Sequence, residues 1–264
     1  MDKLNKKIYL IAAGSFVLLL LAVYFLFIFQ KSPGDIKQEE VIGEVKKLEE
    51  TPLAKRPFVT LTPTSDGAEI IISIENMQEF ERAEYELTYL ADNPTSAGEK
   101  IERGTTGTDV NTKEQKYKKS LLLGTASRGV RNPDTGITDG KLTLHLYIGD
   151  TEFQSESKWI RLEAGQVAST LKDASGKLNI KLPALGKDYW IILADTIGIP
   201  PSPKEFSSED VILPIYGSFA VAPQFSKKAD LTITLDGDLQ DAKIHQYNLS
   251  DSSWKSLSLS LIHI

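Results

Sequence analysis

The sequence predicts a mainly β protein in which an N-terminal transmembrane helix precedes two β-sandwich domains of the immunoglobulin-like kind, the second of them incomplete. Three observations predict this arrangement. Residues 8–29 are apolar and uncharged, and the chain after residue 57 alternates between apolar and polar residues with the period of a strand. Turn sequences rich in Gly, Asp, Asn and Pro separate the alternating segments.

The apolar segment is long enough to cross a membrane. Ile8 to Phe29 contain no charged residue, and a helix of this length spans about 33 Å. A cleaved signal peptide has a shorter apolar core that ends in small residues, whereas this segment ends in Phe-Leu-Phe-Ile-Phe. Three lysines in residues 1–7 predict a cytoplasmic N-terminus and an extracellular remainder. The lipid bilayer is therefore the expected partner of Ile8 to Phe29, and the cell membrane the expected location.

Residues 30–56 predict a charged stalk between the membrane and the first domain. Pro33 and Gly34 end the membrane helix. Four apolar residues then recur at roughly helical spacing among Glu and Lys, so a short amphipathic helix is an alternative; they are Ile36, Val41, Val45 and Leu48.

The remaining chain divides into residues 57–163 and 164–258, each a predicted β-sandwich domain. Alternating or β-branched and aromatic stretches predict strands. In the first domain they are 58–63, 68–75, 83–90, 141–149 and 152–162. In the second they are 176–183, 188–195, 210–217, 229–236 and 242–249. The polar stretch 93–119, rich in Gly and Thr, predicts a long loop.

Residues 200–257 resemble the β-sandwich surface modules of archaeal and bacterial cell-envelope proteins. The residues that carry the resemblance are Phe225, Ala229, Leu231, Tyr247, Trp254 and Leu257. These are core-packing residues, so the resemblance implies a fold and no activity. The stretch that begins at Arg56 more loosely resembles ectodomains of uncharacterised single-pass proteins from uncultivated small-genome bacteria.

Composition excludes several kinds of function. The chain has no cysteine, which removes disulfides, thiolate metal sites and thiol nucleophiles. The net charge is −6, and the densest basic stretch, residues 113–119, is interrupted by Glu and Tyr, so we expect no nucleic-acid binding. No nucleophile elbow, phosphate-binding loop or dinucleotide fingerprint is present. We therefore expect no catalytic residue and no cofactor in this chain.

Two kinds of residue remain as weak candidates for binding. Asp236, Asp238 and Asp241 have the spacing of a calcium-binding turn, although Asp-Gly is also a common hairpin turn. Trp159, Trp190 and Trp254 could stack on sugars, but their strand-like surroundings favour a place in the core. His145 and His245 lie in strand patterns, where exposure is a simpler interpretation than metal ligation.

The last six residues, 259–264, read Leu-Ser-Leu-Ile-His-Ile. This is the translation of the DNA end used in transposase-based library preparation. We therefore expect 259–264 to be an adapter artefact, the protein to continue beyond Ser258, and the source to be metagenomic DNA. The alternative is a genuine strand, because Leu257, Leu259 and Leu261 alternate with serines.

Together these observations predict a single-pass, cell-surface protein with a structural, adhesive or partner-binding role. One alternative is that this region is the anchor and spacer of an envelope enzyme whose catalytic domain lies beyond the truncation. Another is a glycan-binding module, which requires an exposed row of Trp and Tyr on one sheet.

Overall fold

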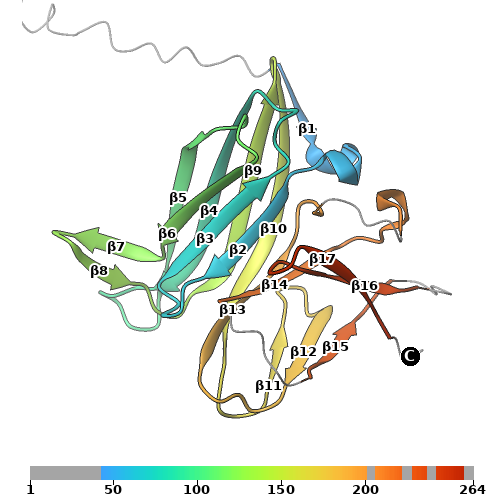
Figure 1. The fold of residues 1–264 in the computed structure, drawn as a ribbon. Helices are drawn as coiled ribbons and strands as arrows, with labels where there is room; N and C mark the ends of the chain where they lie inside the picture. Colours follow the sequence, from blue (N-terminus) through green and yellow to red (C-terminus); the bar gives the residue numbers. More distant parts are fainter. Residues whose placement is uncertain (1–42, 201–205, 222–227, 237–241, 259–264) are drawn as a thin grey trace, which may run out of the picture. The chain divides into compact units, whose positions relative to one another are not determined.

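The computed structural model describes residues 43–200, 206–221, 228–236 and 242–258, and these residues are mainly β (Figure 1). Their helical segments are three short 3-10 turns, Leu48–Glu50, Leu53–Lys55 and Ser208–Asp210. Within the described part, no helix has the length and apolar character needed to cross a membrane. The predicted membrane helix at 8–29 lies outside the described residues.

The largest sheet has seven strands, in the order β14-β13-β10-β9-β4-β5, with β1 pairing in parallel to the first part of β10. All its other pairings are antiparallel. The strands are β1 (Glu44–Lys47), β4 (Arg82–Asp92), β5 (Lys100–Val110), β9 (Thr138–Ile148), β10 (Thr151–Ala164), β13 (Tyr189–Asp195) and β14 (Tyr216–Ala220).

A second, three-stranded sheet packs against one face of this sheet. Its order is β2-β3-β6, and its strands are β2 (Phe58–Pro63), β3 (Glu69–Glu75) and β6 (Lys116–Leu122). Every second residue of β4 is buried, as expected for a strand with one covered face. Strand β9 has the same alternation and in addition buries Thr143 and Tyr147 on its other face. One core joins both sheets; it includes Leu61, Ile72, Leu87, Leu144 and Trp159.

The opposite face of β10 and β13 forms part of a second core. There Ile160 and Leu162 of β10, with Ile191 and Leu193 of β13, cluster with Leu171, Leu178 and Leu182. The covering sheet has the order β11-β12-β15, with β11 at Ser169–Lys172, β12 at Leu178–Leu182 and β15 at Asp230–Ile233. Strand β13 is thus buried on both faces.

Two further hairpins complete the described strands. One consists of β7 (Gly124–Ser127) and β8 (Val130–Pro133), and it extends away from the large sheet (Figure 1). The other consists of β16 (Ile244–Asn248) and β17 (Ser253–Leu257), whose Tyr247 ring lies 6.1 Å from that of Phe58 on β2.

The described part of the predicted stalk, residues 43–56, belongs to the folded unit. Val45 lies in β1 and pairs with Glu152, and Leu48 is fully buried in the first core. The Arg56 side chain donates to the backbone oxygens of Thr51 and Glu49, which holds both 3-10 turns in place. For these residues the expected stalk and its helical alternative are therefore incorrect, because the buried Leu48 and the pairing of β1 with the edge of β10 hold them against the large sheet.

The predicted boundary at residues 163 and 164 does not separate two sheets. Strand β10 ends at Ala164, but β13 pairs with β10 and lies in the same sheet. Ile192 and Ala194 on β13 also contribute to the first core. The β-rich character of both halves is confirmed, and the strands after the boundary complete a sheet begun before it.

Candidate interaction surface

Of the three predicted metal ligands, the structure describes Asp236 alone. Asp236 is 87% exposed and its Oδ2 lies 2.6 Å from Nζ of Lys177. Asp238 and Asp241 lie outside the described residues. Among the residues that the structure describes, no group of three or more His, Asp or Glu side chains could hold a metal ion.

The histidines and tryptophans have different environments. His145 lies on the outer face of β9, with its Nδ1 2.6 Å from Oε1 of the buried Glu152. Trp159 is only 1% exposed and belongs to the first core, so it cannot stack on a sugar. Trp190, on β13, is half-buried beneath the guanidinium of Arg161. Trp254 lies on β17, in a different sheet, and packs against Phe206. The described tryptophans therefore form no exposed row on one sheet.

An ionic network links β4, β5 and the residue that follows β8. Tyr89 donates to Asp134 over 2.9 Å, and Arg103 Nε lies 3.5 Å from the same carboxylate oxygen. Burial and the neighbouring Asp134 carboxylate raise the pKa of Tyr89 well above its ordinary value. Burial lowers the pKa of Arg161, whose guanidinium donates to the Gly67 carbonyl. Because these cations already have partners, the network fixes the strand ends together.

The hairpin β7–β8 is anchored at its base and exposed along its length. All but one of its residues are exposed, and the turn at Arg128 and Gly129 has positive φ at both positions. Arg131 donates to Glu69 over 2.6 Å and to Asp66 over 3.2 Å. The pKa of Glu69 is lowered, first by the hydrogen bond from Ser120 and then by Arg131. The hairpin therefore projects from a fixed base and is available for contact.

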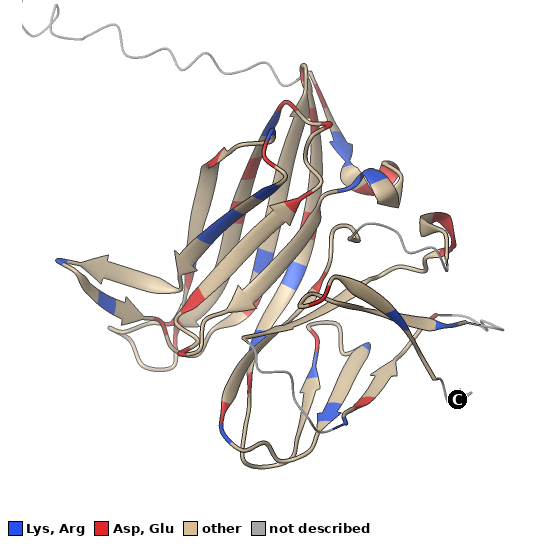
Figure 2. Cartoon of the chain, viewed as in Figure 1, with Lys and Arg blue, Asp and Glu red and all other residues tan. Residues whose placement is uncertain are grey.

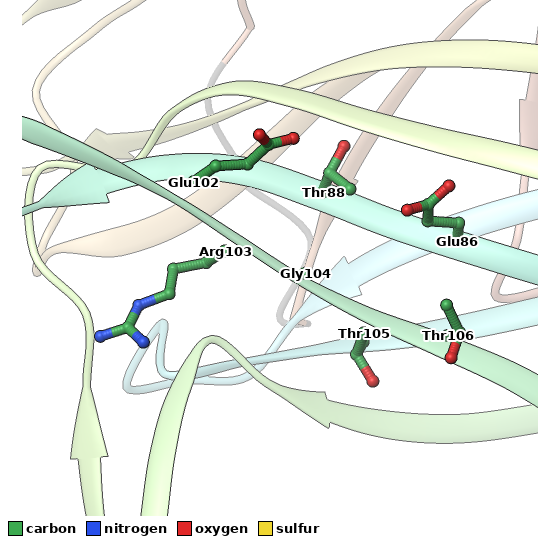
Figure 3. Close-up of a pocket in the computed structure, with 7 residues that line it drawn as sticks. All are labelled: Glu86, Thr88, Glu102, Arg103, Gly104, Thr105 and Thr106. Carbon is green, nitrogen blue, oxygen red and sulfur yellow. The ribbon is translucent and has the colours of Figure 1, made fainter.

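A shallow open groove of about 540 Å³ lies along β4 and β5. Figure 3 shows its lining residues: Glu86, Thr88, Glu102, Arg103, Gly104, Thr105 and Thr106. Within the groove, Gly104, which has no side chain, pairs with Thr88 on β4. Glu86 and Glu102 lie on the exposed face of these strands, one on each side of Gly104 along the strand direction. Arg103 points to the other face (Figure 3).

Charges elsewhere on the described strands are interspersed (Figure 2). The basic stretch on β6 is largely paired: Lys116 contacts Glu75 over 2.7 Å, and Lys119 contacts Asp109 over 2.8 Å. By contrast, no ion pair joins Glu86 or Glu102 to another residue that the structure describes. The β4–β5 face therefore carries uncompensated negative charge.

Comparison with known proteins gives no relative for this chain: no protein-family model, no curated protein and no solved structure matches it. The surface must therefore be interpreted from its own chemistry.

The sequence interpretation missed this surface because it assigned residues 93–119 to a loop. Strand β5 (Lys100–Val110) lies within that stretch, and β6 begins at Lys116. The available signal was its β-branched threonines, Thr105, Thr106 and Thr108, which favour strands. The intervening glycines, which usually mark turns, obscured it.

Proposed function

We propose that this chain is a single-pass membrane protein that presents a β-sandwich outside the cell, where it binds a partner in a structural or adhesive role. The proposal rests on one observation in the sequence: the uncharged segment 8–29 is preceded by Lys3, Lys6 and Lys7 and followed by a β-rich chain. The predicted immunoglobulin-like topology belongs to the same proposal.

The described fold supports a binding role. A broad antiparallel sheet with a well-packed core is a rigid support, and binding residues commonly lie on the edges and loops of such a support. Here the exposed features are the anchored hairpin β7–β8 and the outer edge of β5. A glycan-binding role has less support, because Trp159 is buried.

Membrane insertion and orientation test this proposal directly. The full chain, expressed in a bacterium with a C-terminal tag, should stay in the membrane pellet after alkaline carbonate extraction. Protease added to spheroplasts should remove the tag without cell lysis. A variant with Leu19→Arg and Leu20→Arg should be extracted by carbonate, since each charge at the centre of a membrane helix costs about 3 kcal/mol.

A matched control places the same two charges in the described ectodomain, at the exposed positions Val130 and Val167. That variant should remain in the pellet. Release of the unmodified chain by carbonate, or protection of the tag in intact spheroplasts, would contradict the proposal.

A further inference from the structure

The outer edge of β5 is an unpaired strand edge. Strand β5 is the last strand of the seven-stranded sheet, and no described strand pairs with its other side. Such an edge presents backbone N–H and C=O groups that can pair with another extended segment.

The accessible part of the edge runs from Lys100 to Gly107. Over this stretch the register with β4 is regular, and it shifts only beyond Gly107, where Ala83 pairs with Val110. A bulge of this kind commonly ends strand pairing. Residues 101–107 contain no Lys and no Pro, the residues that most often protect a sheet edge.

Gly104 creates room for an incoming side chain. A residue paired with Gly104 on an added strand would meet no side chain on β5, so a long side chain could extend across it toward Thr88 on β4. A Cβ at this position would lie 3.0 Å from the Leu87 carbonyl oxygen and 3.1 Å from the Thr88 methyl group. The glycine thus keeps the groove open.

The charges around this opening are acidic. Glu102 lies two residues before Gly104, and Glu86 lies two residues before Thr88 on the antiparallel strand, so the carboxylates flank the opening from opposite ends. The cations of β5 are already engaged: Lys100 contacts Asp92 over 2.8 Å, and Arg103 contacts Asp134. On the neighbouring strand β9, Lys141 lies opposite Thr88, and its ammonium group contacts Glu156 over 3.2 Å. An ammonium or guanidinium group above Gly104 would therefore lie between two carboxylates, Glu86 and Glu102, that have no ion-pair partner among the described residues.

We infer that β5 binds an extended segment of a partner protein by strand addition, and that a Lys or Arg of that segment lies over Gly104 between Glu86 and Glu102. The main chain of the segment would supply the pairing and its basic side chain the selectivity. This inference rests on the proposed function, and it specifies both the surface and the chemistry of the partner.

Peptide binding to the full chain in lipid nanodiscs tests the inference. The probe is a fluorescent peptide of alternating Thr and Val with one central Lys, and binding is measured by polarisation. Replacement of both carboxylates, Glu86→Gln with Glu102→Gln, should weaken binding about tenfold, since the peptide Lys loses both of its acidic neighbours. Replacement of the peptide Lys by Glu should abolish binding.

Two controls separate strand addition from simple charge attraction. Glu44→Gln removes an exposed carboxylate of the same sheet on β1, away from β4 and β5, where it pairs with Lys46, and should leave peptide affinity unchanged. A peptide methylated on alternate backbone nitrogens, which keeps its charge but loses main-chain donors, should bind at least tenfold more weakly.

Absence of binding by the Lys peptide would overturn the inference, as would equal binding of the methylated peptide or equal affinity in the Gln variant. These outcomes are independent of the carbonate and protease experiments. A chain that inserts correctly but binds no peptide would refute only the strand addition, whereas a chain that fails to insert would refute the membrane proposal.

Discussion

Glycines determine how closely large aromatic rings approach the strands of the first core. Gly140 pairs with Trp159, and a Cβ added there would lie 2.3 Å from the indole ring. Gly107 likewise pairs with Tyr85, and a Cβ added to Gly107 would lie 2.2 Å from the phenol ring. Glycine is normally unfavourable inside a strand, so its presence opposite these rings reflects a packing requirement.

We therefore expect Gly140→Ala to destabilise the fold by about 1–3 kcal/mol, because the added methyl group overpacks the core and displaces Trp159. Urea unfolding followed by tryptophan fluorescence measures the change. Gly186→Ala is the matched control, since no atom lies within 4 Å of the added Cβ and stability should hardly change. Equal effects of the two substitutions would argue against the packing role of Gly140.

The hydrogen bond from Ser120 to Glu69 predicts a pH-dependent contribution to stability. This bond is the largest cause of the lowered pKa of Glu69. The pKa of Glu69 is therefore lower in the folded protein than in the unfolded chain, where it is near the ordinary 4.5. Such a carboxylate stabilises the folded state at pH values above the unfolded pKa. This stabilisation is lost as the pH falls through the folded-state pKa.

Ser120→Ala should therefore destabilise the protein more at about pH 7 than at about pH 2.5, where the carboxyl group is protonated in both variants. Unfolding free energies of the two proteins at both pH values measure the effect. Ser127→Ala, on the exposed hairpin, should show no pH-dependent difference. A Ser120→Ala effect that is the same at both pH values would exclude this linkage.

Among the elements, β13 shows why some strands are evident from sequence. The run Trp190 to Ala194 is continuously apolar and is flanked by polar residues, which is typical of a strand buried on both faces. The structure confirms a strand at Tyr189–Asp195, with alternate residues in the two cores. Strands β2 and β3 are confirmed close to their predicted bounds for a similar reason, since strong β formers fill them.

Strands β5 and β14 show where sequence patterns fail. The edge strand β5 is exposed at most positions, so burial imposes no apolar alternation on it, and pairing with β4 determines its structure. The predicted strand 210–217 includes Pro214, which has no N–H to donate, and the observed strand begins after it, at Tyr216.

The candidate surface was harder to predict than the fold. Glu86 and Glu102 lie on different strands, and only the register of β4 and β5 places them on either side of Gly104. Nothing local distinguishes them from other exposed glutamates. Among the acidic residues that did show a local pattern, Asp236 pairs with Lys177, and Asp238 and Asp241 lie outside the described residues.

At the scale of the whole molecule, two shared strands join the two cores. Ile192 and Ala194 face the first core, whereas Ile191 and Leu193 face the second. Strand β10 is shared in the same way, with Trp159 in the first core and Ile160 and Leu162 beside the second. Loss of either core would therefore expose one face of a strand that the other core requires.

This arrangement predicts that the two cores unfold together. Leu193→Ala removes a fully buried side chain from the second core and should destabilise the fold by about 2–5 kcal/mol. Because β13 is common to both cores, hydrogen exchange should accelerate to a similar extent for the amides of β4, in the first core, and of β12, in the second.

The exposed Val167 supplies the control for this experiment. It is 78% exposed, so Val167→Ala should leave exchange unchanged in both strands. If Leu193→Ala accelerated exchange only in β12, the second core would open independently and β13 would remain in the first. Parallel acceleration in β4 and β12 would instead mean that the residues before and after position 164 fold as one cooperative unit. The pairing of β10 with β13, which places strands from both sides of that position in one sheet, is the physical reason.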